Sequence, residues 1–407
     1  MFAERSADAQ LNLSVPTHIA PLRAKVLNFI EQRIYPQEKQ LLDGPPQERR
    51  SRLKVLMDEA KAQGLWALGH PAEIGGGGLP FMDYVFINEV VGRSEVATAA
   101  LGTHSLQDSI MLHRYASDEW RDRYLKPLVD GEVFPSFGMT EPAVASSDPT
   151  QLQTTARLEG DEWVINGRKW FTSGAASAAY TTCMARTETD APDHAAFSMI
   201  VVPTNTPGYN IIRDVKVMGE YHGHYEVVYD NVRVPKDNLL GPRGQGFKIA
   251  QDRLGPGRIF HCMRWLGQAQ RAFDLMCKRA NSRIAFGKPL GEHQQIQKFI
   301  FDSAAEIQAS RLLTLHAAQK IDQKDEARIE IGLIKVYGAQ MLHNVIDRAI
   351  QVHGALGVTE DTPLERMYRL ARFARIYDGA DEVHVHTTSR RILNAYSRGE
   401  GFDFGLR

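Results

Sequence analysis

Four stretches of the sequence carry residue types suited to binding a polar ligand. Residues 137–149 combine hydroxyls with small residues, so backbone N–H groups stay accessible to a polar ligand. In residues 166–175, Trp170 and Thr172 stand two apart, and an extended chain places such residues on one side. An aromatic face beside a hydroxyl would suit a flat heterocycle. The alternatives, a Ser/Pro-rich linker and a core tryptophan beside a solvated threonine, stay open for these stretches taken alone.

The third and fourth stretches suit phosphates and other anions. Residues 283–294 are predicted to be a helix exit into a Gly-Pro loop, which leaves Arg, Phe and Gln side chains available to a phosphate or an adenine. The glycines of residues 351–357 allow close approach to the backbone. Asp378 just precedes the glycine that opens the last predicted helix, where the helix dipole favours an anion. A surface helix cap is the alternative for Asp378.

Several familiar catalytic and metal-binding motifs are missing from the sequence. It contains no HExxH, CxxC, GxSxG or Walker motif, and no Rossmann glycine fingerprint follows a predicted strand. The four glycines at 75–78 lack a following Lys-Ser/Thr, so they predict a flexible loop rather than a phosphate cradle. The pairs His222/His224 and His384/His386 do not share a helical face and lack a third ligand at a suitable spacing. We therefore expect no metal site.

The elements that must position these stretches change character twice along the chain. Apolar residues recur at helical spacing from about 18 to 135, short β-rich segments follow to about 240, and long amphipathic helices are predicted over 246–281, 291–322 and 325–352. The strand spacing of about ten residues is typical of a small antiparallel barrel or sandwich, and Asn166-Gly167 predicts a hairpin turn. The last helices can close as a bundle. The predicted fold class is α+β, with an N-terminal helical domain (1–135), a middle β-barrel domain (136–245) and a C-terminal four-helix-bundle domain (246–407).

Composition narrows the class of protein. The 407 residues carry 48 Lys+Arg against 49 Asp+Glu, and this net charge of -1 gives no sign of nucleic-acid binding. Three cysteines are too few for a disulfide framework. No apolar run approaches the ~20 residues of a membrane helix, and residues 1–8 lack the apolar core of a signal peptide. We expect a cytoplasmic protein without a membrane span.

In their order along a helix–strand–helix layout, the four stretches together resemble the acyl-CoA dehydrogenase family. These flavoenzymes introduce a trans double bond between Cα and Cβ of an acyl-CoA thioester. The resemblance extends from the loop at 71–76 to Asp378-Gly379, over nearly the whole chain. The run at 253–258 and the ending Ile376-Tyr377-Asp378-Gly379 are similar to a branch that carries Asp in place of the usual catalytic Glu.

The resemblance implies a role for each matching residue. Asp378 would be the catalytic base, and it is the only candidate because Gly257 occupies the position where some branches place a Glu. Ser147 would lie near the pantetheine of CoA, and Arg258 would contact the CoA nucleotide. The residues that would bind FAD are Met139, Thr140, Trp170, Thr172, Arg283, Phe286, Gln294, Gln351, Gly354 and Gly357.

The same resemblance implies partners. The positions of Arg283, Phe286, Gln294 and the 351–357 loop serve a flavin bound mainly by a neighbouring subunit, so a homo-oligomer is expected, most often a tetramer. Electrons would pass to an electron-transfer flavoprotein, as in fatty acid β-oxidation. Two other functions remain: an oxidase of acyl-CoA or nitroalkanes on the same scaffold, and a flavin- or acyl-CoA-binding protein without turnover. Chain length and branching of the acyl group are left open.

Overall fold

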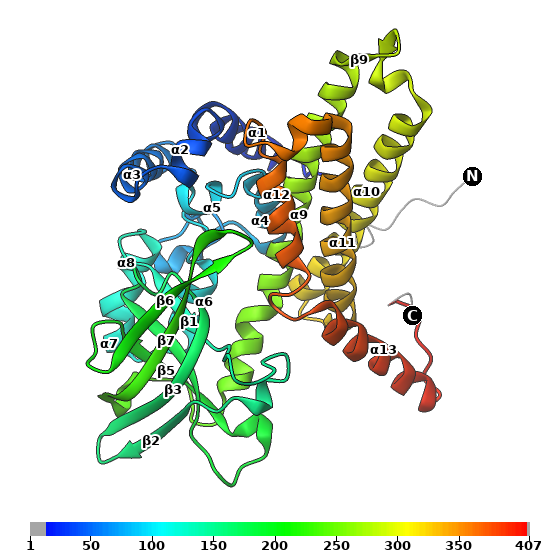
Figure 1. Ribbon diagram of the computed structural model, residues 1–407. Coiled ribbons are helices and arrows are strands. Elements are labelled where there is room, and N and C mark those ends of the chain that lie inside the picture. The colour runs from blue at the N-terminus through cyan, green and yellow to red at the C-terminus, as the bar shows by residue number, and fades with distance from the viewer. Residues whose placement is uncertain (1–13, 405–407) are drawn as a thin grey trace. The chain divides into compact units, whose positions relative to one another are not determined.

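The computed structural model describes residues 14–404, which form two compact units. Unit 1 is built from the described residues within Met1–Leu56, Pro80–Thr98 and Arg258–Arg407, and unit 2 from Met57–Leu79 and Ala99–Gly257. Figure 1 shows the helices and strands of both. The expectation about residues 1–8 lies outside the described range. The boundaries of the three predicted domains stay a prediction.

The first part of the chain is helical, as its apolar spacing predicts. Its helices are α1 (Ala20–Phe29), α2 (Glu38–Asp43), α3 (Pro46–Ala62), α4 (Phe81–Val91), α5 (Ala97–Ala100), α6 (Leu106–Tyr115), α7 (Asp118–Trp120) and α8 (Lys126–Val129). Residues 75–80 are outside helices and strands, so the predicted glycine loop is confirmed. Gly76 is needed there because a Cβ atom would lie 2.3 Å from the carbonyl oxygen of His70.

A mixed sheet fills unit 2. Its strands are β1 (Pro135–Gly138), β2 (Thr155–Glu159), β3 (Glu162–Ser173), β4 (Tyr180–Arg186), β5 (Phe197–Pro203), β6 (Tyr209–Val217), β7 (Glu220–Pro235) and β8 (Leu239–Leu240). The strand order is β6-β7-β3-β2-β4-β5-β8, and β1 pairs with β4. The sequence predicted an antiparallel sheet. The observed sheet is mixed, because β1 and β2 both run parallel to β4.

Strands β4 and β5 are buried on both faces, and even their polar residues Thr181, Thr182 and Ser198 are fully buried. Met184 and Met199 belong to a core shared with the helices of unit 2, including Leu112 and Leu128. Their neighbours along the strands, such as Cys183 and Ile200, turn to the other face and pack in a second core with Trp163 and Tyr229. Side chains that alternate along each strand thus supply two cores.

The predicted hairpin turn at Asn166-Gly167 is wrong. Both residues lie inside β3, and the chain turns between β2 and β3 at Gly160-Asp161 instead. The register of β3 against β7 shifts between Ile165 and Gly167, which marks an irregularity of the bulge type. Glycine is required because a Cβ atom at position 167 would lie 2.4 Å from Thr154 Oγ1.

The last part of the chain consists of long helices. They are α9 (Gly246–Ser282), α10 (Gln294–Asp322), α11 (Arg328–His353), α12 (Leu364–Ala374) and α13 (Asp381–Ser397), with a small hairpin of β9 (Ile284–Ala285) and β10 (Lys288–Pro289) between α9 and α10. The bounds of α9, α10 and α11 agree within three residues with the helices predicted over 246–281, 291–322 and 325–352. In the part of the chain that the structure describes, no helix is both long enough and apolar enough to cross a membrane.

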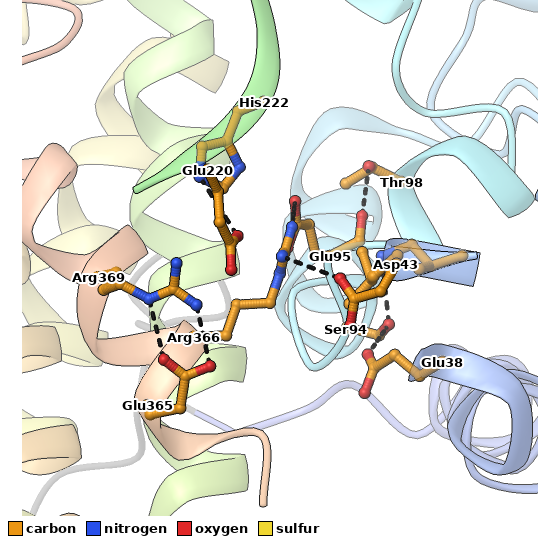
Figure 2. A network of polar contacts seen from close by, with 12 residues as sticks. Glu38, Asp43, Ser94, Glu95, Thr98, Glu220, His222, Glu365, Arg366 and Arg369 are labelled. Atoms are coloured by element: carbon orange, nitrogen blue, oxygen red, sulfur yellow. Dashed lines mark hydrogen bonds and ion pairs between the residues drawn. The ribbon is translucent and has the colours of Figure 1, made fainter. Parts of the chain in front are cut away.

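Ion pairs join the N-terminal and C-terminal segments of unit 1. Arg366 of α12 contacts Glu95 at 3.0 Å and Asp43 at 3.6 Å, as Figure 2 shows. Arg271 of α9 lies 2.7 Å from Glu38, in a pair that is mostly buried. Helix α12, which leads into the Asp378 loop, is therefore anchored to segments that lie far from it in sequence.

Candidate active site

Asp378 lies in the loop between α12 and α13. Its backbone adopts the left-handed region, with φ of +55°, which aspartate tolerates better than most residues. Helix α13 begins at Asp381 after the N-cap residue Ala380, so Asp378 lies further from the helix end than the sequence suggests. The next residue, Gly379, also has a positive φ, and a Cβ atom there would lie 2.5 Å from the His384 Nε2 atom. The loop therefore has an unusual backbone that its surroundings must stabilise.

Three side chains hold carbonyl groups of this loop and of the end of α12. The Lys335 Nζ atom donates to the carbonyl oxygens of Ala374 at 2.6 Å and Gly379 at 3.1 Å. Arg258 Nε donates to the Asp378 carbonyl oxygen at 3.0 Å, and His384 Nε2 lies 3.2 Å from the same oxygen. Because a carbonyl oxygen only accepts, the His384 ring must carry its proton on Nε2.

The lysine is the most deeply buried of these groups. Lys335 has no exposed surface, and its ammonium lies over the rings of Trp265 at 5.2 Å and Tyr377 at 5.5 Å. Trp265 Nε1 in turn donates to the Tyr377 hydroxyl at 2.8 Å. Burial lowers the pKa of Lys335, and burial followed by the charge of Arg258 lowers the pKa of His384 to about 4. His384 is therefore neutral at physiological pH.

The carboxylate of Asp378 contacts a residue that the sequence analysis missed. His261 Nε2 lies 3.0 Å from Asp378 Oδ2, and both side chains are about three-quarters buried. On α9, His261 follows Arg258 by three residues and precedes Trp265 by four, so all three share one helical face. This spacing is visible in the sequence, and it would have found His261 once Arg258 and the helix were assigned.

Arg258 thus lies beside Asp378, and the partner observed for it is the loop backbone. Its predicted contact with the CoA nucleotide stays a prediction. Gly257, just before it, is buried, and a Cβ atom there would lie 2.1 Å from the Gln107 Nε2 atom. The position that some branches fill with a Glu is therefore occupied by the side chain of Gln107.

In unit 2, the structure brings the predicted flavin residues that follow β1, Met139 and Thr140, next to those of β3. The Trp170 backbone N–H donates to the Thr140 carbonyl oxygen at 2.9 Å, and the Lys169 Nζ atom donates to the Met139 carbonyl oxygen at 2.9 Å. The register of β3 shifts between Lys169 and Thr172, where Phe171 has φ of +50°. This irregularity interrupts the regular alternation from which the same-side placement of Trp170 and Thr172 was predicted.

Two orphaned polar atoms test whether these residues fit a flavin. Trp170 Nε1 and Thr172 Oγ1 are buried, and within residues 14–404 neither has a hydrogen-bond partner. Buried donors almost always find an acceptor. A flat heterocycle with ring nitrogens and carbonyl oxygens would supply acceptors for both, so the residues fit FAD. Ser147 is exposed in the turn that precedes Pro149–Gln151.

The remaining predicted residues lie elsewhere in unit 1. Arg283, Phe286 and Gln294 are exposed at or next to the β9–β10 hairpin, and Phe286 is 97% exposed. Position 283 follows position 258 along α9 by about 37 Å at the helical rise of 1.5 Å per residue; the hairpin lies at the far end of that helix (Figure 1). Arg283, Phe286 and Gln294 are thus separated from Asp378 of the same chain.

The 351–357 segment forms the end of α11 and the turn after it. Gln351 and Gly354 are exposed, whereas Gly357 is buried, and a Cβ atom on it would lie 2.7 Å from the Ile350 carbonyl oxygen. The two outer positions are open to a ligand or to another chain. Close packing within the chain explains the glycine at 357 without a ligand.

Among the described residues, no group of three or more His, Cys, Asp or Glu side chains is arranged to hold a metal ion.

Comparison with known proteins gives matches over almost the whole chain. Family models described as the N-terminal, middle and C-terminal domains of acyl-CoA dehydrogenase match residues 18–132, 136–232 and 244–393. The probable acyl-CoA dehydrogenase FadE2 of Mycobacterium tuberculosis is 47% identical over 351 residues, which is 84% of this chain and 86% of that protein. A solved structure from Mycobacterium abscessus, assigned to the acyl-CoA dehydrogenases, superimposes with a TM-score of 0.88 at 38% identity and covers 94% of this chain and 100% of its own.

A longer relative matches with part of its length. Human acyl-CoA dehydrogenase family member 11 is 41% identical over 380 residues, which is 89% of this chain and 48% of that protein. The chain thus spans about half the length of this relative, and the match does not extend to the rest of it.

Proposed function

The chain belongs to the acyl-CoA dehydrogenase family, whose members are flavin-dependent oxidoreductases, and on this premise we propose that it forms the α,β double bond of an acyl-CoA with FAD as cofactor and Asp378 as base. The observation that carries the proposal is the Asp378 loop. Its left-handed backbone is held by Arg258, Lys335 and His384, while the carboxylate is met by His261. A cap on a surface helix would need none of these buried partners.

The chain's own residues account for the first half of the reaction. The Asp378 carboxylate takes a proton from the carbon α to the thioester carbonyl, and the electron pair of that bond moves toward the carbonyl oxygen. Arg258 and Lys335 bring two positive charges to the loop and hold its carbonyl groups, so the backbone that carries the base stays in one conformation. FAD, when bound, supplies the acceptor for the hydride that leaves Cβ.

The flavin would be held from several places. Met139, Thr140, Trp170 and Thr172 would meet the ring, supported by the two orphaned donors on β3. Arg283, Phe286, Gln294, Gln351, Gly354 and Gly357 would serve the FAD of a neighbouring protomer, which agrees with the exposure of most of them and with the separation of the hairpin from Asp378. Ser147 and Arg258 would contact CoA.

A homo-oligomer follows from the shared cofactor site. Large apolar side chains that are exposed in unit 1, such as Phe286, Phe301 and Leu393, support an interface with other copies. An electron-transfer flavoprotein as electron acceptor and a cytoplasmic location belong to the same proposal, on the strength of the family and of the sequence.

The experiment starts from the visible spectrum of the purified protein. We expect bound flavin, and anaerobic titration with acyl-CoAs of different chain length should bleach it with one class. Asp378→Asn should keep the flavin and lose the bleaching, whereas Asp361→Asn, at an exposed position before α12, should bleach like the wild type. Bleaching of Asp378→Asn at the wild-type rate would contradict the assignment of the base.

The oxidase remains the second candidate function, because nitroalkane-oxidising relatives also carry Asp at the base position. Steady oxygen consumption with peroxide release, from an acyl-CoA or a nitroalkane, would favour it. A yellow protein that no acyl-CoA or nitroalkane bleaches would favour binding without turnover.

A further inference from the structure

The ring of His261, on α9, contacts the Asp378 carboxylate. Its Nε2 atom lies 3.0 Å from Asp378 Oδ2, and its other ring nitrogen, Nδ1, lies 2.9 Å from the Arg264 Nη2 atom. A guanidinium only donates, so Nδ1 must be the acceptor of that bond. The proton of the neutral ring is then on Nε2, and it points at the carboxylate.

Arg264 also disfavours a second proton on this ring. A proton on Nδ1 would replace the acceptor by a donor that faces a guanidinium group, with a like charge beside it. Burial, and after it the charge of Arg264, lower the pKa of His261, while Asp378 acts in the opposite direction. His261 is therefore a neutral donor at physiological pH rather than a proton carrier.

The surroundings of the pair come from several elements. The titratable and charged groups around it are Arg258, Cys262 and Arg264 of α9, Tyr84 of α4, Lys335 of α11, Tyr377 of the loop, and Asp381 and His384 of α13. Arg258 and Lys335 are both engaged with backbone carbonyl groups of the loop. His384 is likewise turned to the Asp378 carbonyl oxygen. The ring of His261, in contrast, contacts the carboxylate itself.

We propose that His261 is a positioning residue for the reaction: held by Arg264, it donates its Nε2 proton to Asp378 Oδ2 and restricts the rotation of the carboxylate that removes the Cα proton. This inference rests on the proposed function. In the step itself the Cα–H bond breaks, the proton goes to Asp378, and the electron pair stays with the thioester. His261 keeps its own proton throughout.

The shorter side chain of aspartate explains why such a partner is useful here. A base with one methylene fewer than glutamate reaches about 1.5 Å less far, and a misplacement of about 1 Å can cost on the order of 100-fold in rate. The bonds from Arg258, Lys335 and His384 reach carbonyl groups of the loop, and these bonds do not set the angle of the carboxylate about its Cβ–Cγ bond. His261 supplies that restraint.

The test compares three variants of the holoenzyme. His261→Leu removes the donor with similar volume, His261→Gln can place an amide N–H near the position of Nε2, and His386→Leu changes an exposed histidine of α13 as the matched control. The readouts are the rate of anaerobic flavin reduction by an acyl-CoA against pH, and the exchange of α-protons with D₂O in a 3-thia-acyl-CoA. In that probe a sulfur replaces Cβ, so proton removal is measured without hydride transfer.

We expect His261→Leu to slow both processes by about 10- to 100-fold at neutral pH, in line with the loss of one hydrogen bond to a charged group. The acidic limb of its pH profile should move to higher pH, because the ionised carboxylate loses a donor. His261→Gln should restore the position of that limb and most of the rate, and His386→Leu should match the wild type. The visible spectrum and melting temperature show whether each variant keeps its flavin and fold.

The outcomes separate this inference from the proposed function. If Asp378→Asn is inactive but a folded, flavin-bound His261→Leu protein exchanges α-protons at the wild-type rate with an unmoved pH profile, the positioning role is refuted and the base assignment stands. If His261→Gln is as impaired as His261→Leu, the donated proton is not the relevant feature, and the inference fails as well. If Asp378→Asn still exchanges α-protons, the proposed function itself is wrong.

Discussion

A buried ion pair in unit 2 gives the sharpest prediction about stability. Lys169 and Glu141 are 0% and 3% exposed, and their side chains meet at 2.7 Å. Glu141 also accepts from the backbone N–H groups of Gln153 at 2.7 Å and Thr154 at 2.9 Å. Lys169 makes a second bond to the carbonyl oxygen of Met139. The pair therefore joins β3 to the segment that carries Met139 and Thr140.

Lys169→Met keeps an unbranched side chain that is one atom shorter and removes its charge. The change deletes two bonds of the ammonium and leaves a buried carboxylate with its backbone donors only. Breaking a buried pair from one side costs about 3–5 kcal/mol, so we expect a fall in melting temperature on the order of 10 °C. Flavin should be lost more readily, because Met139 loses the donor that holds its carbonyl group.

The loss of stability in Lys169→Met should depend on pH, and the pKa of Glu141 decides the direction. Burial alone would raise the pKa of Glu141, but Lys169 and the bonds from Thr154 and Gln153 outweigh it and hold the pKa below the usual value. Without Lys169 the pKa of Glu141 rises. The deficit of Lys169→Met against the wild type should therefore be largest near neutral pH and shrink as the pH falls toward 5, where protonation neutralises the buried group.

The assay is thermal unfolding, followed by circular dichroism and by flavin fluorescence, for Lys169→Met, Glu141→Gln and the double variant. The double variant should be less destabilised than the sum of the two single ones, since each single change leaves one partner behind. Lys126→Met is the matched control in unit 2, because its ion pair with Asp130 is exposed. A melting temperature within about 1 °C of the wild type, or strict additivity, would refute this reasoning.

Two more predictions concern unit 2. Burial lowers the pKa of the fully buried His70 from 6.5 to about 4. Between these pH values the unfolded state binds more protons than the folded state. The free energy of unfolding of the wild type should therefore fall by up to about 3 kcal/mol as the pH falls from 6.5 to 4. His70→Gln should lose less over that window in melting curves, and an equal loss would show that another group is responsible. Gly167→Ala should cost about 1–3 kcal/mol because its Cβ atom would overlap Thr154, whereas Gly255→Ala, with nothing within 4 Å, should unfold at or above the wild-type temperature. Equal melting of the two alanine variants would argue against the overlap at position 167.

Much of the fold could be predicted from the sequence because local pattern decides it. Helical apolar spacing predicted α9 to α11 within three residues, and the order of helical and β-rich regions, with the motifs placed on them, predicted a family and a fold class that are confirmed. The parallel pairing of β1 and β2 with β4 could not be predicted, since pairing partners are set by long-range packing rather than by local composition.

The errors have the same origin. Asn-Gly is a turn signal when no tertiary contact competes, but here Thr154 packs against Gly167 and the dipeptide bends a continuous strand. The pair of Lys169 and Glu141 was missed because a charged residue in a strand looks solvent-exposed until its partner is known. His261 was missed for a related reason: its spacing from Arg258 places both on one face of α9, but its contact with Asp378, more than a hundred residues later, is set by tertiary packing.

In the Asp378 loop, different residues fix the position of the catalytic base and the orientation of its carboxylate. A left-handed aspartate followed by a glycine is an unfavourable backbone, and the bonds from Arg258, Lys335 and His384 to the loop's carbonyl groups offset that cost. These contacts fix where the base lies, while the contact with His261 fixes how its carboxylate is turned. Two different losses should follow: variants of Lys335 should lower stability and activity together, whereas His261→Leu should lower activity in a protein that still folds and binds flavin. The separation of the two effects distinguishes a catalytic base from a helix cap, because activity would not depend on how a capping carboxylate is oriented.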